Sequence, residues 1–306
     1  MGAGRFAPSP SGDLHLGNLR TAILAWLFAR STERAFLIRV EDLDRARAGS
    51  EELQLADLAA IGLSWDGDVV RQSERSGHYA GALDELRDRE MLYECFCTRR
   101  DIAEAASAPH AAPGTYPGTC RNLTGTERAA KRELRPAALR LRTEVGSFAV
   151  ADQLHGTYTG AVDDFVVLRN DGVPAYNLAV VVDDGLQGID QVVRGDDLLS
   201  SAPRQAYLAQ LLGYGIPGYA HVPLALNSHG KRLAKRDGAV TLAQLAALGI
   251  DADGARSMIL ASLGLPTASL DAALDAFEPT SLPTDPWVFT TDPNALGTGK
   301  TIGWPS

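Results

Sequence analysis

The stretch RFAPSPSGDLHLGN, residues 5–18, decides the fold class that this sequence predicts. Its first three residues are typical of the end of a short strand, which the Pro- and Gly-rich turn that follows breaks. A long apolar helix is expected over residues 19–30, beginning directly after Gly17 and Asn18. Because such a turn and helix start aim backbone N–H groups at an anion, this stretch predicts a phosphate-binding element.

The segments that follow alternate between strand and helix patterns. Residues 35–40 (AFLIRV) form an apolar run typical of a buried strand, and helices are expected over residues 51–61 and 78–91. This order is typical of an α/β fold with a doubly wound parallel sheet. Glu41 follows the second strand directly, which places it at the edge of the sheet where such folds bind their ligands.

Beyond residue 92 the pattern changes. Cysteines, prolines and glycines cluster between residues 95 and 120, which indicates an insertion into the sheet. A turn is expected at residues 170–172, a helix over 201–212, three short helices after Thr241, and an irregular tail at the end of the chain. Further strands are expected over residues 139–142, 148–154, 164–169, 176–182, 191–193 and 221–226.

Composition and charge set few limits on the function. The 306 residues carry a formal net charge of −9, which disfavours a nucleic-acid partner only weakly because binding depends on local patches. No stretch is typical of a membrane span or a secretory signal, so we expect a monomeric protein in the cytoplasm. One basic run is either a solvated helix face or an RNA-facing patch; it contains Arg128, Lys131, Arg132, Arg135, Arg140 and Arg142.

Two segments have the composition of a nucleotide site, although each signal is weak alone. His15 can donate to a phosphoryl oxygen, but a histidine at a helix start is more often a local cap or a surface residue. Residues 230–238 (GKRLAKRDG) follow an apolar strand and can fold over a polyphosphate, with lysine neutralising its charge. Taken alone, this second segment is more typical of an exposed basic loop.

All three cysteines of the chain lie in the predicted insertion. Cys95, Cys97 and Cys120 are soft ligands that suit one structural Zn²⁺ ion per chain, which needs a fourth donor. His110 is the conventional candidate for that position, and Tyr116 is an unusual one. The residues by themselves leave this choice open.

Taken together, these segments resemble the class I aminoacyl-tRNA synthetases. Residues 15–18 and 230–238 are similar to the two signature motifs of that family, HIGH and KMSKS. Further blocks resemble its glutamyl branch, namely RFAPSPSG at 5–12, FLIRVEDLD at 36–44 and RGDD at 194–197. The blocks occur in the family's order between Arg5 and Trp287, so the resemblance covers nearly the whole chain.

The resemblance implies a site for glutamate and for ATP with Mg²⁺. Arg5 and Arg194 would bind carboxylate oxygens, since the planar arginine fork meets a carboxylate in two parallel bonds. Glu41 would take the substrate ammonium group, and Ser9 and Tyr176 would supply neutral hydrogen bonds. The remaining residues implied for glutamate are Phe6, Ala7 and Pro8. Those implied for ATP are His15, Gly17, Asn18 and Lys235, of which His15 and Lys235 are the implied catalytic residues.

The second signature motif departs from the family pattern at two positions. Arg232 stands where a lysine is usual and keeps the positive charge, whereas Ala234 replaces a serine and loses one hydroxyl. Lys235, the lysine implied to lie closest to the transferred phosphates, is retained. We interpret the segment as a modified but active loop.

The cysteine pattern narrows the resemblance further. Cys-x-Cys followed by Tyr-x₃-Cys is similar to that of shortened paralogues of glutamyl-tRNA synthetase, which implies Tyr116 as the fourth zinc ligand. It also implies glutamate activation without tRNA, then transfer to the queuosine base in the anticodon of tRNA(Asp). The apparent lack of a helical anticodon-binding part agrees with this expectation. The alternatives are a truncated synthetase that charges a tRNA 3′ end, or a non-enzymatic binding protein of synthetase ancestry.

The same resemblance implies how the chain is divided. A Rossmann-like catalytic domain is expected in two halves, with a zinc-bearing acceptor insertion between them and a small helical stem-contact region after them. The expected boundaries are 1–92 and 161–228 for the two halves, 93–160 for the insertion, 229–287 for the KMSKS-like loop with the helical region, and 288–306 for an irregular tail.

Overall fold

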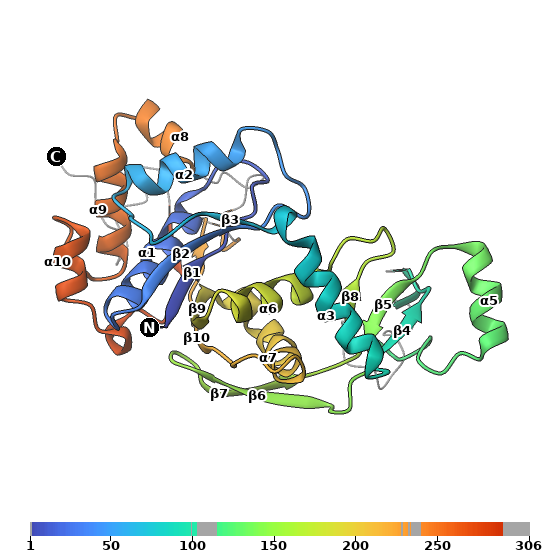
Figure 1. Ribbon diagram of the computed structural model, residues 1–306. Coiled ribbons are helices and arrows are strands. Elements are labelled where there is room, and N and C mark those ends of the chain that lie inside the picture. Colours follow the sequence, from blue (N-terminus) through green and yellow to red (C-terminus); the bar gives the residue numbers. More distant parts are fainter. Residues whose placement is uncertain are drawn as a thin grey trace.

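A computed structural model describes residues 2–98, 100–102, 115–227, 229–231, 233 and 240–289. A seven-stranded sheet lies at the centre, in the order β3-β2-β1-β9-β10-β6-β7 (Figure 1). Neighbouring strands from β3 to β6 are parallel, and β7 alone runs antiparallel, to β6. The strands are β1 (Ala3–Phe6), β2 (Ala35–Val40), β3 (Val70–Arg71), β6 (Ser147–Asp152), β7 (Gly156–Ala161), β9 (Ile189–Gly195) and β10 (Gly218–Val222). The predicted doubly wound sheet is confirmed.

The strand order reverses next to β1, which is the kind of position where open α/β sheets bind their ligands. From β1 the chain continues to β2 and β3 on one side, while β9 and β10 fill the other side. Strands β1 and β9 are parallel neighbours, with Ala3 opposite Ile189 and Gly4 opposite Gln191. In open α/β sheets the crevice beyond the carboxyl ends of two such strands is where ligands bind. Arg5, Glu41 and Arg194 lie at or directly after the carboxyl ends of β1, β2 and β9, so these predicted residues share one edge of the sheet.

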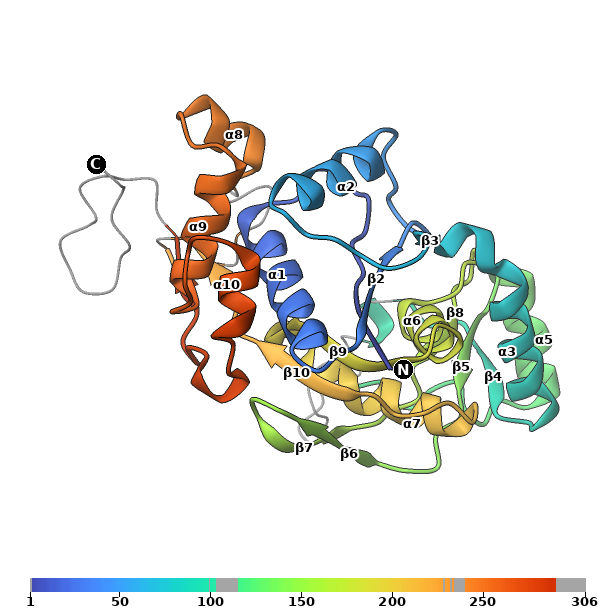
Figure 2. The ribbon, with the colours of Figure 1, turned by 60° about the vertical axis from the view of Figure 1, so that its left-hand side comes forward.

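Helix α1 (Leu16–Arg30) is buried on almost every side. The C-terminal helices α9 (Ala252–Ser262) and α10 (Leu270–Asp275) pack over it on the side away from the sheet, and α8 (Leu242–Ala247) packs against α9 (Figure 2). Phe28 meets Phe277 edge to face, with ring centroids 5.1 Å apart. The guanidinium of buried Arg20 donates to the Pro223 carbonyl at 2.7 Å and to Ser262 at 3.2 Å. This packing explains why the helix is apolar all round.

A second, three-stranded sheet forms one end of the molecule (Figure 1). Its strands β4 (Leu92–Cys95), β5 (Ala138–Leu141) and β8 (Val166–Leu168) are antiparallel, and α5 (Gly125–Leu134) lies beyond them with no buried residue. Strands β6 and β7, which fall between β5 and β8 in the sequence, belong to the large sheet instead. The chain therefore passes from the large sheet to the small one at β4, returns to the large sheet for β6 and β7, adds β8 to the small sheet, and returns to the large sheet at β9.

The predicted strand over residues 176–182 is wrong, because this segment begins the helix α6 (Tyr176–Leu186). Its residues 178–182 are buried against α3 (Ser76–Asp88), α7 (Ala202–Leu211), β8 and β9, so this part of the run has no polar face to reveal a helical period. The turn at residues 170–172 is confirmed, with Gly172 at φ +83°. It leads from β8 into the start of α6 rather than into another strand.

The strand predicted over residues 221–226 is also only partly correct. The chain forms β10 and then, after Pro223, a separate strand β11 (Ala225–Leu226) that pairs with β12 (Trp287–Val288). Val288, which we expected in the irregular tail, thus lies in a strand, and residues 290–306 lie outside the described part.

The helices predicted over residues 19–30, 51–61, 78–91 and 201–212 are confirmed, with ends that differ from the observed ones by at most three residues. Within the ranges described above, no helix is both long and apolar enough to cross a membrane. The remaining elements are α2 (Ser50–Ala60), α3 (Ser76–Asp88), α7 (Ala202–Leu211) and the 3₁₀ turns Gln72–Arg75, Asp196–Ser201 and Pro279–Ser281.

Candidate active site and metal site

A buried charge network lies beneath the crevice. Arg5 of β1 donates from Nε and Nη2 to the two oxygens of Asp184, at 3.2 and 3.3 Å. Arg39 of β2 is fully buried and donates to the same carboxylate at 2.7 Å. Burial disfavours the charge of Asp184, but the two arginines outweigh it and hold the pKa of that carboxyl below its usual range. Two cations thus converge on one anion.

Glu41 lies at the carboxyl end of β2, as predicted. Its backbone N–H donates to the Pro8 carbonyl at 2.9 Å, which ties the end of β2 to the turn after β1. Arg39 Nη2 lies 3.4 Å from its carboxylate. Burial raises the pKa of Glu41, although Arg39 and Arg5 act in the opposite direction. A substrate ammonium beside this carboxylate would offset the cost of burying its charge.

Tyr176 and Arg194 face the same crevice from α6 and β9. Desolvation and the negative charge of Glu41 raise the pKa of Tyr176, whereas the positive charges of Arg194 and Arg5 lower it. Gln205 links the two elements, since it accepts from Arg194 at 2.7 Å and donates to Asn177, the residue after Tyr176, at 3.0 Å. Tyr176 is 43% exposed, so part of its ring remains open to solvent at the mouth of the crevice. The structure therefore brings together the four principal residues that the family resemblance implied for glutamate.

The guanidinium of Arg194 is buried and held from three sides. Its Nε donates to His221 Nε2 at 3.0 Å, Nη1 donates to Gln205 Oε1 at 2.7 Å, and Nη2 donates to the Leu198 carbonyl at 3.3 Å. Its central carbon lies 5.5 Å from the centre of the Tyr219 ring. All these contacts are with neutral groups, so the positive charge of Arg194 is available to an anionic ligand.

In the turn between β1 and α1, some side chains are buried in the core and others are open to solvent. Phe6 packs into the main hydrophobic core and Pro8 is buried, while Ala7 is half-buried and Ser9 is exposed. Buried Gln54 donates to the carbonyls of Ser9 and Gly12, at 3.0 and 2.6 Å, and fixes the path of the turn. Among the five residues predicted at this turn, the Ser9 hydroxyl is thus the group most open to a ligand.

His15 caps helix α1. Its Nδ1 accepts the backbone N–H of Asn18 at 3.3 Å, and the Asn18 side chain accepts the His15 N–H at 3.2 Å. Because Nδ1 is an acceptor, the ring proton lies on Nε2 in the neutral form, as donation to a phosphate requires. A Cβ at Gly17 would lie 3.1 Å from the imidazole, so glycine leaves the room that this ring occupies.

The two flanks of the second signature motif lie beside the first. The Leu233 N–H donates to the Ala225 carbonyl at 2.9 Å, and Leu16 at the start of α1 donates to Val240 at 3.0 Å. Thr241 forms an antiparallel bridge with His15. Val240 and Thr241 thus contact the start of α1 directly, and Leu233 bonds to β11, which packs against α1. Arg232, Ala234 and the predicted catalytic Lys235 lie outside the described residues.

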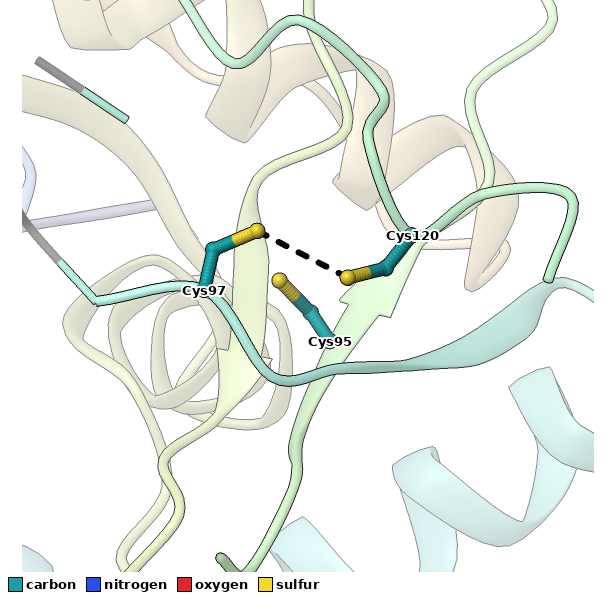
Figure 3. A group of neighbouring side chains, drawn as sticks. All are labelled: Cys95, Cys97 and Cys120. Carbon is teal, nitrogen blue, oxygen red and sulfur yellow. Dashed lines mark hydrogen bonds between the residues drawn. The ribbon is translucent and has the colours of Figure 1, made fainter. Parts of the chain in front are cut away.

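Cys95, Cys97 and Cys120 form one cluster (Figure 3). Their three sulfurs point toward one another and lie within 4.8 Å, with 3.6 Å between those of Cys97 and Cys120. Cys95 and Cys120 are buried and all three thiols are free. The set can hold a metal ion.

The Tyr116 hydroxyl lies at the same cluster. It is 3.4 Å from the Cys95 sulfur and 3.8 Å from the Cys97 sulfur, and it accepts the backbone N–H of Cys120 at 2.8 Å. The Arg140 guanidinium lies 3.6 Å from the centre of the tyrosine ring. Burial works against the Cys95 thiolate, but bonds to Tyr116 and Arg140 lower its pKa. His110, the alternative fourth donor, lies outside the described residues.

The predicted basic run separates into two parts. Arg128, Lys131, Arg132 and Arg135 are exposed on or directly after α5. Arg140 is instead buried beside Tyr116, and half-buried Arg142 donates to the Arg121 carbonyl, so neither belongs to that surface. Of the exposed residues, Arg132 already pairs with Glu94 at 2.7 Å.

The sequence patterns did not single out the residues that hold the crevice together. The sequence offers one signal for them, namely a polar residue within or directly after an apolar run, which indicates a buried polar group with a partner. Such residues are Arg39, Asp184 and His221. Their partners are far away along the chain, since Arg39 and Asp184 are separated by 145 positions.

Comparison with known proteins gives the same family as the motifs. Residues 3–279 match the family model described as tRNA synthetases class I (E and Q), catalytic domain. A glutamyl-Q tRNA(Asp) synthetase of Nocardia farcinica is 61% identical over 290 residues, covering 94% of this chain and 93% of that protein. Another of that name, from Cutibacterium acnes, is 55% identical and covers 86% of this chain and 76% of that protein.

Solved structures agree with this result. The crystal structure of a glutamate tRNA ligase from Elizabethkingia meningosepticum, in complex with its amino acid, is 27% identical with a TM-score of 0.79. The similarity covers 94% of this chain and 67% of that one. The fold class and the resemblance predicted from the sequence are therefore confirmed. The chain belongs to the class I aminoacyl-tRNA synthetases of the glutamyl and glutaminyl type, which are ligases, and within them to the group named glutamyl-Q tRNA(Asp) synthetases.

Proposed function

We propose that the chain activates glutamate with ATP and then transfers it to the queuosine base in the anticodon of tRNA(Asp). The observation that carries the first half is that β1, β2, β9 and the start of α6 bring Arg5, Glu41, Arg194 and Tyr176 to the same edge of the sheet. Two arginines, one carboxylate and one hydroxyl suit an amino acid that has two carboxylates and one ammonium. The second half rests on the names of the relatives that share most of this chain's length.

Activation needs charge placement rather than a protein nucleophile. The α-carboxylate of glutamate attacks the α-phosphorus of ATP, the bond to the bridging oxygen breaks, and pyrophosphate leaves. His15 Nε2 and the N-terminus of α1 face the negative charge that grows on the phosphoryl oxygens. Lys235 is proposed to neutralise the leaving pyrophosphate from the second motif. Mg²⁺ supplies further neutralisation when it is bound with ATP.

Transfer uses the reactive mixed anhydride that activation creates. A hydroxyl of the modified base attacks the glutamyl carbonyl, and AMP leaves as the acyl–oxygen bond to phosphate breaks. We propose that residues 93–160 form the side of the molecule that receives the RNA, with the exposed residues Arg128, Lys131, Arg132 and Arg135 near its phosphates. Residues 229–287 are proposed to contact the stem.

The Cys95, Cys97 and Cys120 cluster is proposed to hold a structural Zn²⁺, with Tyr116 as the fourth ligand. Zn–S bonds of about 2.3 Å in a tetrahedron place two sulfurs about 3.8 Å apart. The 3.6 Å between Cys97 and Cys120 fits that geometry, and the Tyr116 hydroxyl lies at similar distances from the other sulfurs. Three thiolate donors and one oxygen leave no position open for a substrate, which favours a structural role.

Pyrophosphate exchange tests the activation step in isolation. Purified protein with radiolabelled pyrophosphate, ATP and glutamate should form labelled ATP without any tRNA, whereas glutamine or aspartate should support much less exchange. Exchange that appears only after tRNA is added would favour the alternative, a truncated synthetase that charges a tRNA 3′ end. No exchange under either condition would favour a binding protein that has lost catalysis.

A further inference from the structure

Three neighbouring parallel strands each contribute one residue to a buried chain of hydrogen bonds behind Arg194. Arg194 of β9 lies opposite His221 of β10, and Asp152 ends β6 on the far side of β10. Arg194 Nε is 3.0 Å from His221 Nε2, and His221 Nδ1 is 2.6 Å from Asp152 Oδ2. The three residues are 5%, 0% and 5% exposed respectively. Such a polar chain in the middle of a sheet requires an explanation.

The hydrogen bonds fix the tautomer of His221. An arginine Nε–H can only donate, so His221 Nε2 must present a lone pair and the ring proton must lie on Nδ1, facing Asp152. Asp152 suits this role because every group around it is a donor. Its Oδ2 also accepts the His221 backbone N–H at 3.1 Å, and its Oδ1 accepts the N–H groups of Leu154 and His155 at 2.9 and 3.0 Å.

The same bonds determine which donors of Arg194 remain for a ligand. A guanidinium has five N–H groups, one on Nε and two on each terminal nitrogen. His221, Gln205 and the Leu198 carbonyl take three of them, one from each nitrogen. One N–H is left on Nη1 and one on Nη2. That pair is what a carboxylate needs for two parallel hydrogen bonds.

We propose that His221 and Asp152 are positioning residues that orient Arg194 toward the side-chain carboxylate of glutamate. This assignment rests on the proposed function, because it requires glutamate to be the ligand of Arg194. His221 accepts from Nε of Arg194, the guanidinium nitrogen that carries a single hydrogen. Asp152 holds the imidazole in the tautomer that allows this contact. Neither residue touches the substrate. Their effect is on the affinity for glutamate, through Arg194.

A purely structural role makes a different prediction. Buried polar groups also stabilise a fold, and losing one lowers stability without regard to which substrate is bound. A positioning residue instead affects one substrate selectively. The KM for glutamate and the KM for ATP therefore separate the two roles, provided that the stability of each variant is measured alongside.

The test uses tRNA-independent pyrophosphate exchange with the full chain. His221→Phe keeps a ring of similar size but cannot accept from Arg194, and we expect the KM for glutamate to rise on the order of tenfold or more, with the KM for ATP little changed. His221→Gln restores an acceptor and should recover most of that loss. Asp152→Asn puts an NH₂ group where only acceptors fit, and it should act in the same direction as His221→Phe. His78→Ala, an exposed histidine on α3, is the matched control.

A double-mutant comparison identifies the route of the effect. In an Arg194→Ala background, His221→Phe should add little to the loss in glutamate affinity, since both changes remove the same contact. Additive losses, equal changes in both KM values, or a loss that follows the melting temperature alone would overturn the assignment. If the wild type shows no glutamate-dependent exchange, or Arg194→Ala leaves the glutamate KM unchanged, the proposed pocket itself is wrong and the assignment falls with it. If Arg194→Ala raises the glutamate KM but His221→Phe does not change it, only the positioning role is overturned.

Discussion

Arg5 and Arg194 are held by different partners, and the difference determines how each can meet a substrate. Arg5 gives two donors to Asp184, a carboxylate that it shares with Arg39. Arg194 gives three donors to neutral acceptors. Its charge is therefore balanced by no carboxylate among these contacts. At the residue scale, Arg194 is the better candidate for the bond to the glutamate side chain. Arg5 adds a positive charge that Asp184 partly neutralises.

The choice between glutamate and glutamine should depend on Arg194. Arg194→Ala removes charge-assisted hydrogen bonds worth about 1.5–3 kcal/mol each, and each lost bond corresponds to about a 10- to 150-fold fall in kcat/KM for glutamate. The preference over glutamine should shrink by a similar factor, because an amide cannot use that charge. Pyrophosphate exchange with both amino acids measures this.

Arg87, exposed on α3, provides the control substitution to alanine for that experiment. It forms a surface ion pair with Asp84, so its loss should change exchange very little. If the unaltered protein used glutamine as well as glutamate, the assignment of the two arginines to a carboxylate would be wrong.

The sequence could predict residues that belong to local motifs, and it could not predict their distant supports. Arg5, Glu41 and Arg194 stand at strand ends within blocks that resemble a family, so the resemblance by itself implies their roles. Asp152 and His221 are 69 positions apart and meet only because β6 returns to pair with β10. No local period or spacing encodes that contact, since it depends on the strand order.

At the scale of whole elements, local sequence pattern explains both the correct and the incorrect predictions of secondary structure. Strand β2 was predicted with its observed bounds, because a six-residue apolar run ends in charged residues. Helix α6 was predicted as a strand, because its first seven residues (YNLAVVV) are rich in β-branched and apolar side chains. Burial against two helices and two strands outweighs that local preference.

The metal site is an element-scale prediction, because it joins β4 to the loop that contains Tyr116. Protein purified without added metal should contain one zinc ion per chain by elemental analysis. Tyr116→Phe should reduce zinc retention, since it removes the oxygen donor and the acceptor for the Cys120 N–H. Loss of the ion should destabilise the small sheet more than it impairs adenylate formation.

His110→Ala is the comparison that decides the fourth ligand. If Tyr116 is the ligand, this variant should keep its zinc. Retention in Tyr116→Phe together with loss in His110→Ala would assign the position to the histidine instead.

Helix α2 carries a charge that the folded state disfavours. Burial and the nearby charge of Asp13 raise the pKa of Asp57 from 3.8 to about 6. The folded state therefore binds the proton of the Asp57 carboxyl more tightly than the unfolded state does. The destabilisation of the folded state by ionised Asp57 is absent below pH 3.8 and grows until the pH passes the folded pKa of about 6. Asp57→Asn should stabilise the protein above that range by about 1–2 kcal/mol, allowing for solvent screening.

Urea unfolding at two pH values measures this effect. The gain should be present near neutral pH and should largely disappear at about pH 4, where aspartate in both states is increasingly protonated. An equal gain at both values would mean that the substitution acts through something other than the charge of Asp57.

At the scale of the whole molecule, α5 lies at one end, the large sheet near the middle and the C-terminal helices at the other end (Figure 1). The proposed activation site contains buried charges such as Arg5 and Arg194, while the proposed RNA contacts from α5 are exposed. Salt screens exposed charges strongly and buried ones much less. Transfer to RNA should therefore weaken steeply as salt rises, whereas pyrophosphate exchange should change little.

The combined substitution Arg128→Ala and Lys131→Ala should reduce the slope of that salt dependence and leave exchange intact. Arg132 is a less informative target, because Glu94 already pairs with it. A transfer reaction with the same salt slope before and after the double substitution would place the RNA elsewhere on the molecule.

The central claim is that glutamate ends on a modified anticodon base, and one measurement tests it most directly. Radiolabelled glutamate and ATP are supplied with queuosine-containing tRNA(Asp) or with the same tRNA lacking that modification, and the labelled nucleotide is identified after nuclease digestion. The account predicts label only on the tRNA that carries queuosine, and at the modified base. Equal labelling of both tRNAs, or label on the 3′ terminal adenosine, would contradict it.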